Sequence, residues 1–107
     1  MNRKERRLAL KSALAYKAIE SKMIVVDKLE VASTKTKDMK AILKDLNITN
    51  KVLIVVDELN ENLILSSRNL NNVLLLSVDE INTYDVVYAD TMLITEKALK
   101  QLEEVLK

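Results

Sequence analysis

The chain of 107 residues is long enough for one folded domain and too short for two of ordinary size, so we expect residues 1–107 to form a single domain. Hydrophobic residues make up 49% and charged residues 31%, which excludes a disordered chain, and the absence of Cys and His excludes disulfides and the usual zinc sites. The net charge of +1 is unevenly distributed, because residues 1–51 hold 13 Lys or Arg against 6 Asp or Glu, while residues 52–107 hold 4 against 10. The first half is therefore the candidate for contact with a polyanion.

The first predicted element is an amphipathic helix over residues 3–22. Its apolar residues Leu10, Ala13, Leu14 and Ala18 recur with the period of an α-helix. Residues 3–7 are polar on every side, so we expect the first two turns to project past the body of the domain.

Four short apolar runs predict strands that are buried on both faces: residues 23–26, 52–56, 73–76 and 92–94. Stretches compatible with helices lie between and after them, at residues 36–46, 60–70, 79–88 and 96–106. This alternation predicts an α/β three-layer sandwich with a four-stranded parallel sheet. No run is long enough to span a membrane and no secretion signal is recognisable, so we expect a cytoplasmic protein without a membrane partner.

Several polar residues follow the predicted strands, where parallel sheets usually bind their ligands. Asp27, Asp57 and Asp79 could gather around magnesium, as in receiver-like phosphoryl-transfer domains. The alternative is that Asp57, Asp79 and Thr95 cap the helices that follow them. No nucleophile has a suitable base, so we expect neither an enzyme nor a cofactor.

The three tyrosines are too scattered to predict a platform on which RNA bases stack. Tyr84 and Tyr88 are four residues apart in a helical stretch, and we expect them to pack in the core or at its rim. RNA binding would then depend on phosphates, grooves and shape, and would weaken with salt.

Residues 57–73, which read DELNENLILSSRNLNNV, resemble the family of bacterial large-subunit ribosomal protein four. Other segments follow in the order and spacing of that family's carboxyl-terminal half, namely NRKERRLALKSAL, MIVVDKLEV, STKTKDMKAILKDL, INTYDVVYAD and MLITEKALKQLEEVL. The resemblance covers essentially all of this chain and about half of a typical family member.

This resemblance implies a parallel sheet with strand order 1423 and a structural role in the large ribosomal subunit, in the cytoplasm. The implied partners are large-subunit rRNA and neighbouring ribosomal proteins. The family's tunnel loop and amino-terminal helix have no counterpart here, so contact with the peptide tunnel is not expected. The missing helix would leave an apolar patch on one sheet face, and self-association of the truncated domain is a further expectation.

The resemblance also implies which residues bind rRNA. The matching positions are Arg3, Lys4, Arg6, Arg7, Lys11, Lys35, Lys37, Arg68 and Asn69. Arg suits bidentate contact with phosphate, whereas Lys acts as a mobile point charge. For Arg68 and Asn69 the alternative is that they only end a helix and satisfy local carbonyls.

Six residue types are missing altogether: Gly, Pro, Phe, Cys, His and Trp. The family commonly has Pro or Gly where this chain has Ser33-Thr34, Asn71 and Glu80-Ile81. We interpret the sequence as a truncated and engineered domain with a reduced amino-acid alphabet. The alternative is a scaffold that keeps only the fold, without retained function.

Overall fold

Helices and strands alternate along the chain in this computed structural model, which describes residues 3–27, 29, 36–68 and 70–106. The helices are α1 (Arg3–Ile19), α2 (Thr36–Asp45), α3 (Glu61–Ser67), α4 (Thr83–Tyr88) and α5 (Glu96–Val105), with a 3₁₀ turn η1 (Val78–Glu80). The strands are β1 (Met23–Val26), β2 (Val52–Val56), β3 (Val73–Ser77) and β4 (Thr91–Thr95). Within the described ranges, no helix is both long enough and apolar enough to cross a membrane.

The four strands form one parallel sheet in the order β1-β4-β2-β3. This confirms the predicted α/β fold and the strand order 1423. The central strand β2 is paired on both sides, so that Val55 lies beside Leu76 of β3 and Ile94 of β4. Its five residues are all buried, as a continuous run of β-branched and aliphatic residues predicts.

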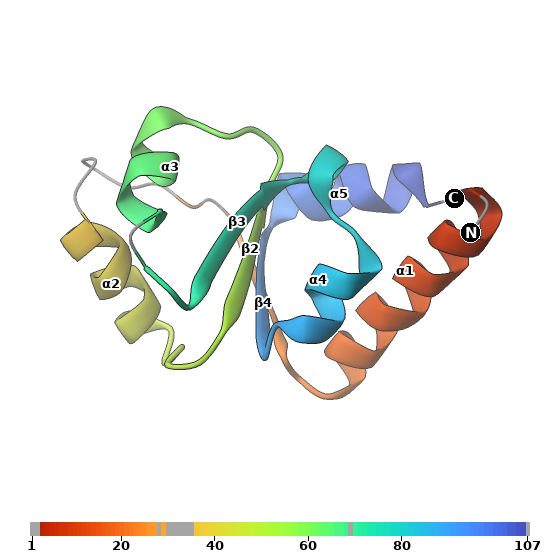
Figure 1. The fold of residues 1–107 in the computed structure, drawn as a ribbon, viewed down its shortest axis with the longest axis horizontal. Coiled ribbons are helices and arrows are strands. Elements are labelled where there is room, and N and C mark those ends of the chain that lie inside the picture. The colour runs from red at the N-terminus through yellow and green to blue at the C-terminus, as the bar shows by residue number, and fades with distance from the viewer. Residues whose placement is uncertain (1–2, 28, 30–35, 69, 107) are drawn as a thin grey trace.

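Helices cover both faces of the sheet, with α2 and α3 on one side and α1, α4 and α5 on the other (Figure 1). Alternate residues of β2 point to opposite faces. Leu53 and Val55 belong to the core under α1, α4 and α5, whereas Ile54 and Val56 belong to the core under α2 and α3. The two cores therefore share one strand.

The expectation of an uncovered sheet face is wrong for the central strands, because α1, α4 and α5 cover β2 and β4. Among the described strand residues of this face, the exposed apolar side chains lie on the two edge strands. Val25 of β1 is 47% exposed and Leu74 of β3 is 43% exposed, and their register partners Ile94 and Leu53 are fully buried. Larger exposed apolar side chains lie on the helices instead, including Tyr16 and Ile19 of α1.

The residue that caps the helix differs from the predicted one in two of the three helices considered. Thr95 caps α5 as predicted, since its hydroxyl accepts a hydrogen bond of 3.3 Å from the N–H of Ala98. Asn60, not Asp57, caps α3, and Asn82, not Asp79, caps α4. The predicted helix over 79–88 is split, because the chain is extended at Ile81 and Asn82 between η1 and α4.

Two helices end in the left-handed conformation that glycine normally supplies. Ser21 and Asn47 both have a φ of 58°. After α1, Ser21 N–H donates to Ala18 O and Lys22 N–H to Lys17 O, at 3.1 and 2.9 Å. This is the Schellman pattern, and α2 ends in the same way around Asn47.

We expect Ser21→Gly to raise the free energy of unfolding by about 0.5–1 kcal/mol, because a left-handed residue with a Cβ costs roughly 1–2 kcal/mol and glycine offsets part of this gain by its entropy. Urea denaturation measures the change. Ser12→Gly, in the middle of α1, is the matched control and should lower stability by about 0.5 kcal/mol. Equal changes in the two variants would contradict this reading of Ser21.

Candidate nucleic-acid interface

Helix α1 carries the largest group of predicted rRNA-binding residues. Lys4, Arg6, Arg7 and Lys11 are all exposed, while Arg3 lies in the helix and its side chain is outside the described part. The first turns do not project freely, contrary to expectation. Arg6 and Arg7 line a hollow of about 670 Å³ together with the start of α4 and the end of α5.

The other predicted residues lie elsewhere. Lys37 is exposed in the first turn of α2, and Arg68 follows α3, so both belong to the layer on the opposite face of the sheet from α1. The Arg68 backbone N–H donates to Ile64 O at 3.1 Å and ends α3, while its side chain is exposed. Lys35 and Asn69 lie outside the described residues. The structure thus separates the predicted residues into two groups.

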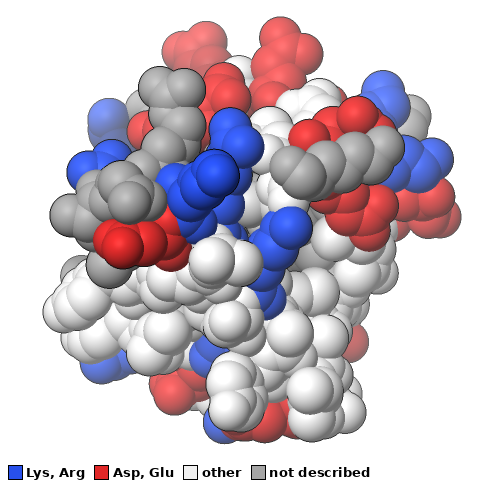
Figure 2. Space-filling model, turned by 90° about the vertical axis from the view of Figure 1, so that its right-hand side faces the viewer, with Lys and Arg blue, Asp and Glu red and all other residues white. Residues whose placement is uncertain are grey.

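The face that carries α1 is mixed in charge. Figure 2 shows Lys and Arg side chains across the upper half of this face, interspersed with Asp and Glu, above a broad uncharged surface. Helices α1 and α4 expose several large apolar or aromatic side chains, including Tyr16, Ile19, Tyr84, Val87 and Tyr88. Basic and apolar groups therefore adjoin on the side of the molecule that α1 occupies.

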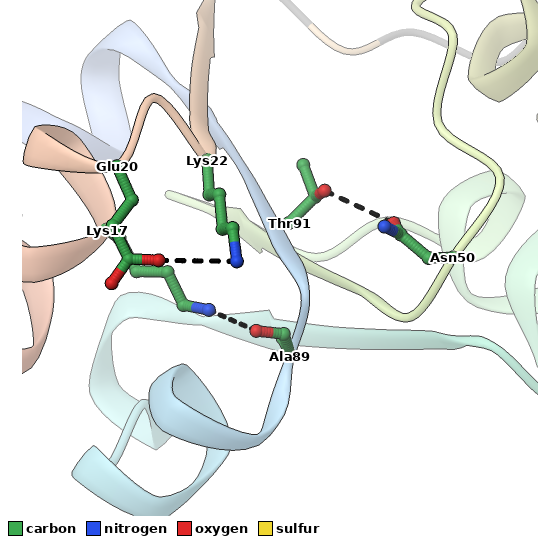
Figure 3. A network of polar contacts seen from close by, with 6 residues as sticks. All are labelled: Lys17, Glu20, Lys22, Asn50, Ala89 and Thr91. Carbon is green, nitrogen blue, oxygen red and sulfur yellow. Dashed lines mark hydrogen bonds and ion pairs between the residues drawn. The ribbon is translucent and has the colours of Figure 1, made fainter.

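A polar network lies at the amino-terminal ends of the strands (Figure 3). Lys17 Nζ donates to the Ala89 carbonyl, and Lys22 forms an ion pair of 3.2 Å with Glu20. The Thr91 hydroxyl donates to Asn50 Oδ1 at 3.2 Å. The contact between Lys17 and Ala89 ties the end of α1 to the segment between α4 and β4, and the contact between Thr91 and Asn50 ties the start of β4 to the segment before β2.

Lys51, just before β2, interacts with two tyrosines of α4. Its Nζ donates to Tyr88 Oη at 2.8 Å and lies 4.1 Å from the centre of the Tyr88 ring. The rings of Tyr84 and Tyr88 stack at a centroid distance of 6.0 Å with an interplanar angle of 11°. The hydrogen bond from Lys51 to Tyr88 is the main cause that raises the pKa of Lys51. Desolvation opposes this rise, and electrostatic interactions with Tyr88, Asp90 and Tyr84 add to it.

Of the two predicted positions for Tyr84 and Tyr88, in the core or at its rim, the core is wrong, since the two side chains are 74% and 58% exposed. Their spacing correctly placed them on one side of a helix. Lys51 was not predicted as their partner, because it lies 37 residues away from Tyr88 and no local pattern connects them.

The acidic carboxyl-terminal edge of the sheet does not form the magnesium site considered above. Asp27, Asp57 and Glu58 line a hollow of about 260 Å³ together with Lys97, but Asp79 lies in η1 and is not among its lining residues. Among the described residues, no group of three acidic side chains is placed to hold a metal ion.

The chain is similar to members of a ribosomal protein family. The family model described as the ribosomal protein L4/L1 family matches residues 1–105. The large ribosomal subunit protein uL4 of Magnetococcus marinus is 47% identical over 104 residues, which cover 97% of this chain and 50% of that protein. The protein of the same name from Lachnoclostridium phytofermentans is 47% identical over 105 residues, which cover 98% and 50%. The chain thus spans about half the length of the curated relatives it matches.

We expect Tyr88→Phe to lower the pKa of Lys51 toward its ordinary value of 10.5, because the variant lacks the hydroxyl that accepts the hydrogen bond. Carbon-13 NMR of the lysine Cε during a pH titration measures this pKa. A pKa that is higher in the folded state favours folding below pH 10.5, and the benefit disappears as pH rises through the raised value. Tyr84→Phe is the control and should change the pKa less; the opposite order would contradict the assignment.

Proposed function

Because the chain belongs to the ribosomal protein L4/L1 family, we propose that it is a structural constituent of the large ribosomal subunit and binds rRNA through basic side chains. The family resemblance predicted from the sequence is confirmed, and coverage of about half of each relative agrees with a carboxyl-terminal half. The family and the relatives are named for the ribosome, which supports a non-enzymatic role in the cytoplasm.

The observation that carries this proposal is the exposed basic series on α1. Lys4, Arg6, Arg7 and Lys11 fall within two turns of one helix. One guanidinium group can donate two parallel hydrogen bonds to the oxygens of one phosphate. The ammonium groups of lysine attract the phosphate backbone regardless of its base sequence. Lys37 and Arg68 lie on the opposite layer, so an rRNA that contacted them as well would have to reach both sides of the sheet.

We expect Arg6→Gln combined with Arg7→Gln to weaken binding to the cognate rRNA fragment and to flatten its dependence on salt. Each lost phosphate contact should reduce the slope of log K against log salt concentration by about one. Titrations at several salt concentrations measure both quantities. Lys97→Gln combined with Lys100→Gln on α5 removes the same charge and should change them less.

The RNA-binding proposal fails if the chain shows no preference for the cognate fragment over unrelated RNA and no change of affinity with salt. That result, obtained with a folded chain, would favour a scaffold that keeps only the fold.

The absence of six residue types supports the proposal that the sequence is engineered with a reduced amino-acid alphabet. Ser21 and Asn47 support it too, because both adopt a backbone conformation that favours glycine. We propose that residues 1–107 fold as one domain, because both cores use the same strands β2 and β4.

We also propose that the isolated chain self-associates through the apolar surface on the α1 side. Tyr16 and Ile19 are 66% and 79% exposed, and a second hollow of about 400 Å³ between α1 and α5 is lined mainly by apolar residues. Exposed apolar surface of this kind favours association. Sedimentation velocity should show an average mass that rises with concentration, and Ile19→Lys should reduce this rise. A monomer at every concentration would contradict the proposal.

A further inference from the structure

The hollow beside Arg6 and Arg7 combines cationic, apolar and aromatic groups. Its lining comes from α1, from the segment that begins α4 and from the end of α5: Arg6, Arg7, Ala9, Leu10, Ile81, Asn82, Thr83, Tyr84, Val105 and Leu106. None of these described residues is acidic. The volume of about 670 Å³ lies within the range of roughly 300–1,000 Å³ that is usual for sites that bind small molecules.

Tyr84 lines this hollow, and its side chain is 74% exposed and so accessible to a ligand. Tyr88 stacks against the Tyr84 ring, and Lys51 in turn contacts Tyr88 through both its ring and its hydroxyl. The order along this surface is therefore Lys51, Tyr88, Tyr84 and then the hollow. A side chain that is ordered before binding loses less conformational entropy when a ligand stacks on it.

We propose that this hollow binds an unpaired nucleobase of RNA, which stacks on Tyr84 while Arg6 and Arg7 hold the adjacent phosphates. A nucleotide joins a planar ring to an anion, which matches an aromatic and apolar surface flanked by two guanidinium groups. The inference rests on the proposed rRNA binding and specifies one mode of contact within it.

Stacking on Tyr84 should contribute more to binding than reading of the base edge. Asn82 is the lining side chain best suited to read a base edge, but each of its polar atoms already makes one hydrogen bond to Asp85, which leaves one N–H and one lone pair. Its Oδ1 accepts from Asp85 N–H at 2.9 Å, and its Nδ2 donates to Asp85 Oδ2 at 2.8 Å. Stacking tolerates any base, so we expect affinity without strong sequence preference.

The test compares a labelled decamer of adenylate with an abasic decamer of the same length by fluorescence anisotropy. The wild-type chain should bind the adenylate decamer more tightly than the abasic one. Tyr84→Leu should weaken binding of the adenylate decamer about fivefold or more and leave binding of the abasic decamer unchanged. Tyr16→Leu removes an exposed tyrosine of α1 that does not line the hollow, and it should keep the preference for bases.

Tyrosine emission gives a second readout, because the chain has three Tyr and no Trp. Adenylate should quench the emission of wild type and of Tyr16→Leu, and quench Tyr84→Leu less. Circular dichroism establishes that each variant is folded. Equal affinity for the two decamers, or equal effects of the two substitutions, would overturn the inference while leaving rRNA binding by phosphate contacts intact. If the chain bound neither decamer and also did not bind the cognate rRNA fragment, both proposals would be overturned.

Discussion

Strand β2 is buried along its whole length, and this burial explains the layered fold. Each of its five residues is at most 2% exposed, and burying an aliphatic side chain of this size contributes about 1.5–3 kcal/mol. Burial on both faces requires helices on both sides, because alternate residues point in opposite directions. Parallel pairing to β3 and β4 requires crossover connections, and the helices supply them. One apolar strand thus determines the layered arrangement.

The same arrangement decides where the positive charge lies. In the sequence, the excess of Lys and Arg over residues 1–51 suggests a single basic region. In the structure, β1 separates α1 from α2 along the chain, and these helices cover opposite faces of the sheet (Figure 1). The proposed contacts with RNA use the α1 side, where Arg6, Arg7 and Tyr84 of α4 line the same hollow.

A chain without glycine still needs residues in the left-handed conformation where helices turn into strands. Ser21 and Asn47 take these positions, and Asn tolerates them better than most residues because its short polar side chain can bond locally. Asn71 and Asn72, which also follow a helix, are not among the described residues with a positive φ. The fold therefore accommodates the restricted composition at helix ends, at a local cost in stability.

The fold class could be predicted from the amino-acid sequence, because continuous apolar runs between amphipathic helices leave few arrangements other than a parallel sheet. The family followed from the resemblance of whole segments, such as residues 57–73, and not from this pattern. The sequence located the strands to within a residue or two, and it identified Thr95 as a cap from its position after a strand. The grouping of basic residues on one surface and the contact of Lys51 with Tyr88 became visible only in the folded chain. Such contacts join residues that are distant in the chain, and they arise from the packing of whole helices, which no local pattern of residues encodes.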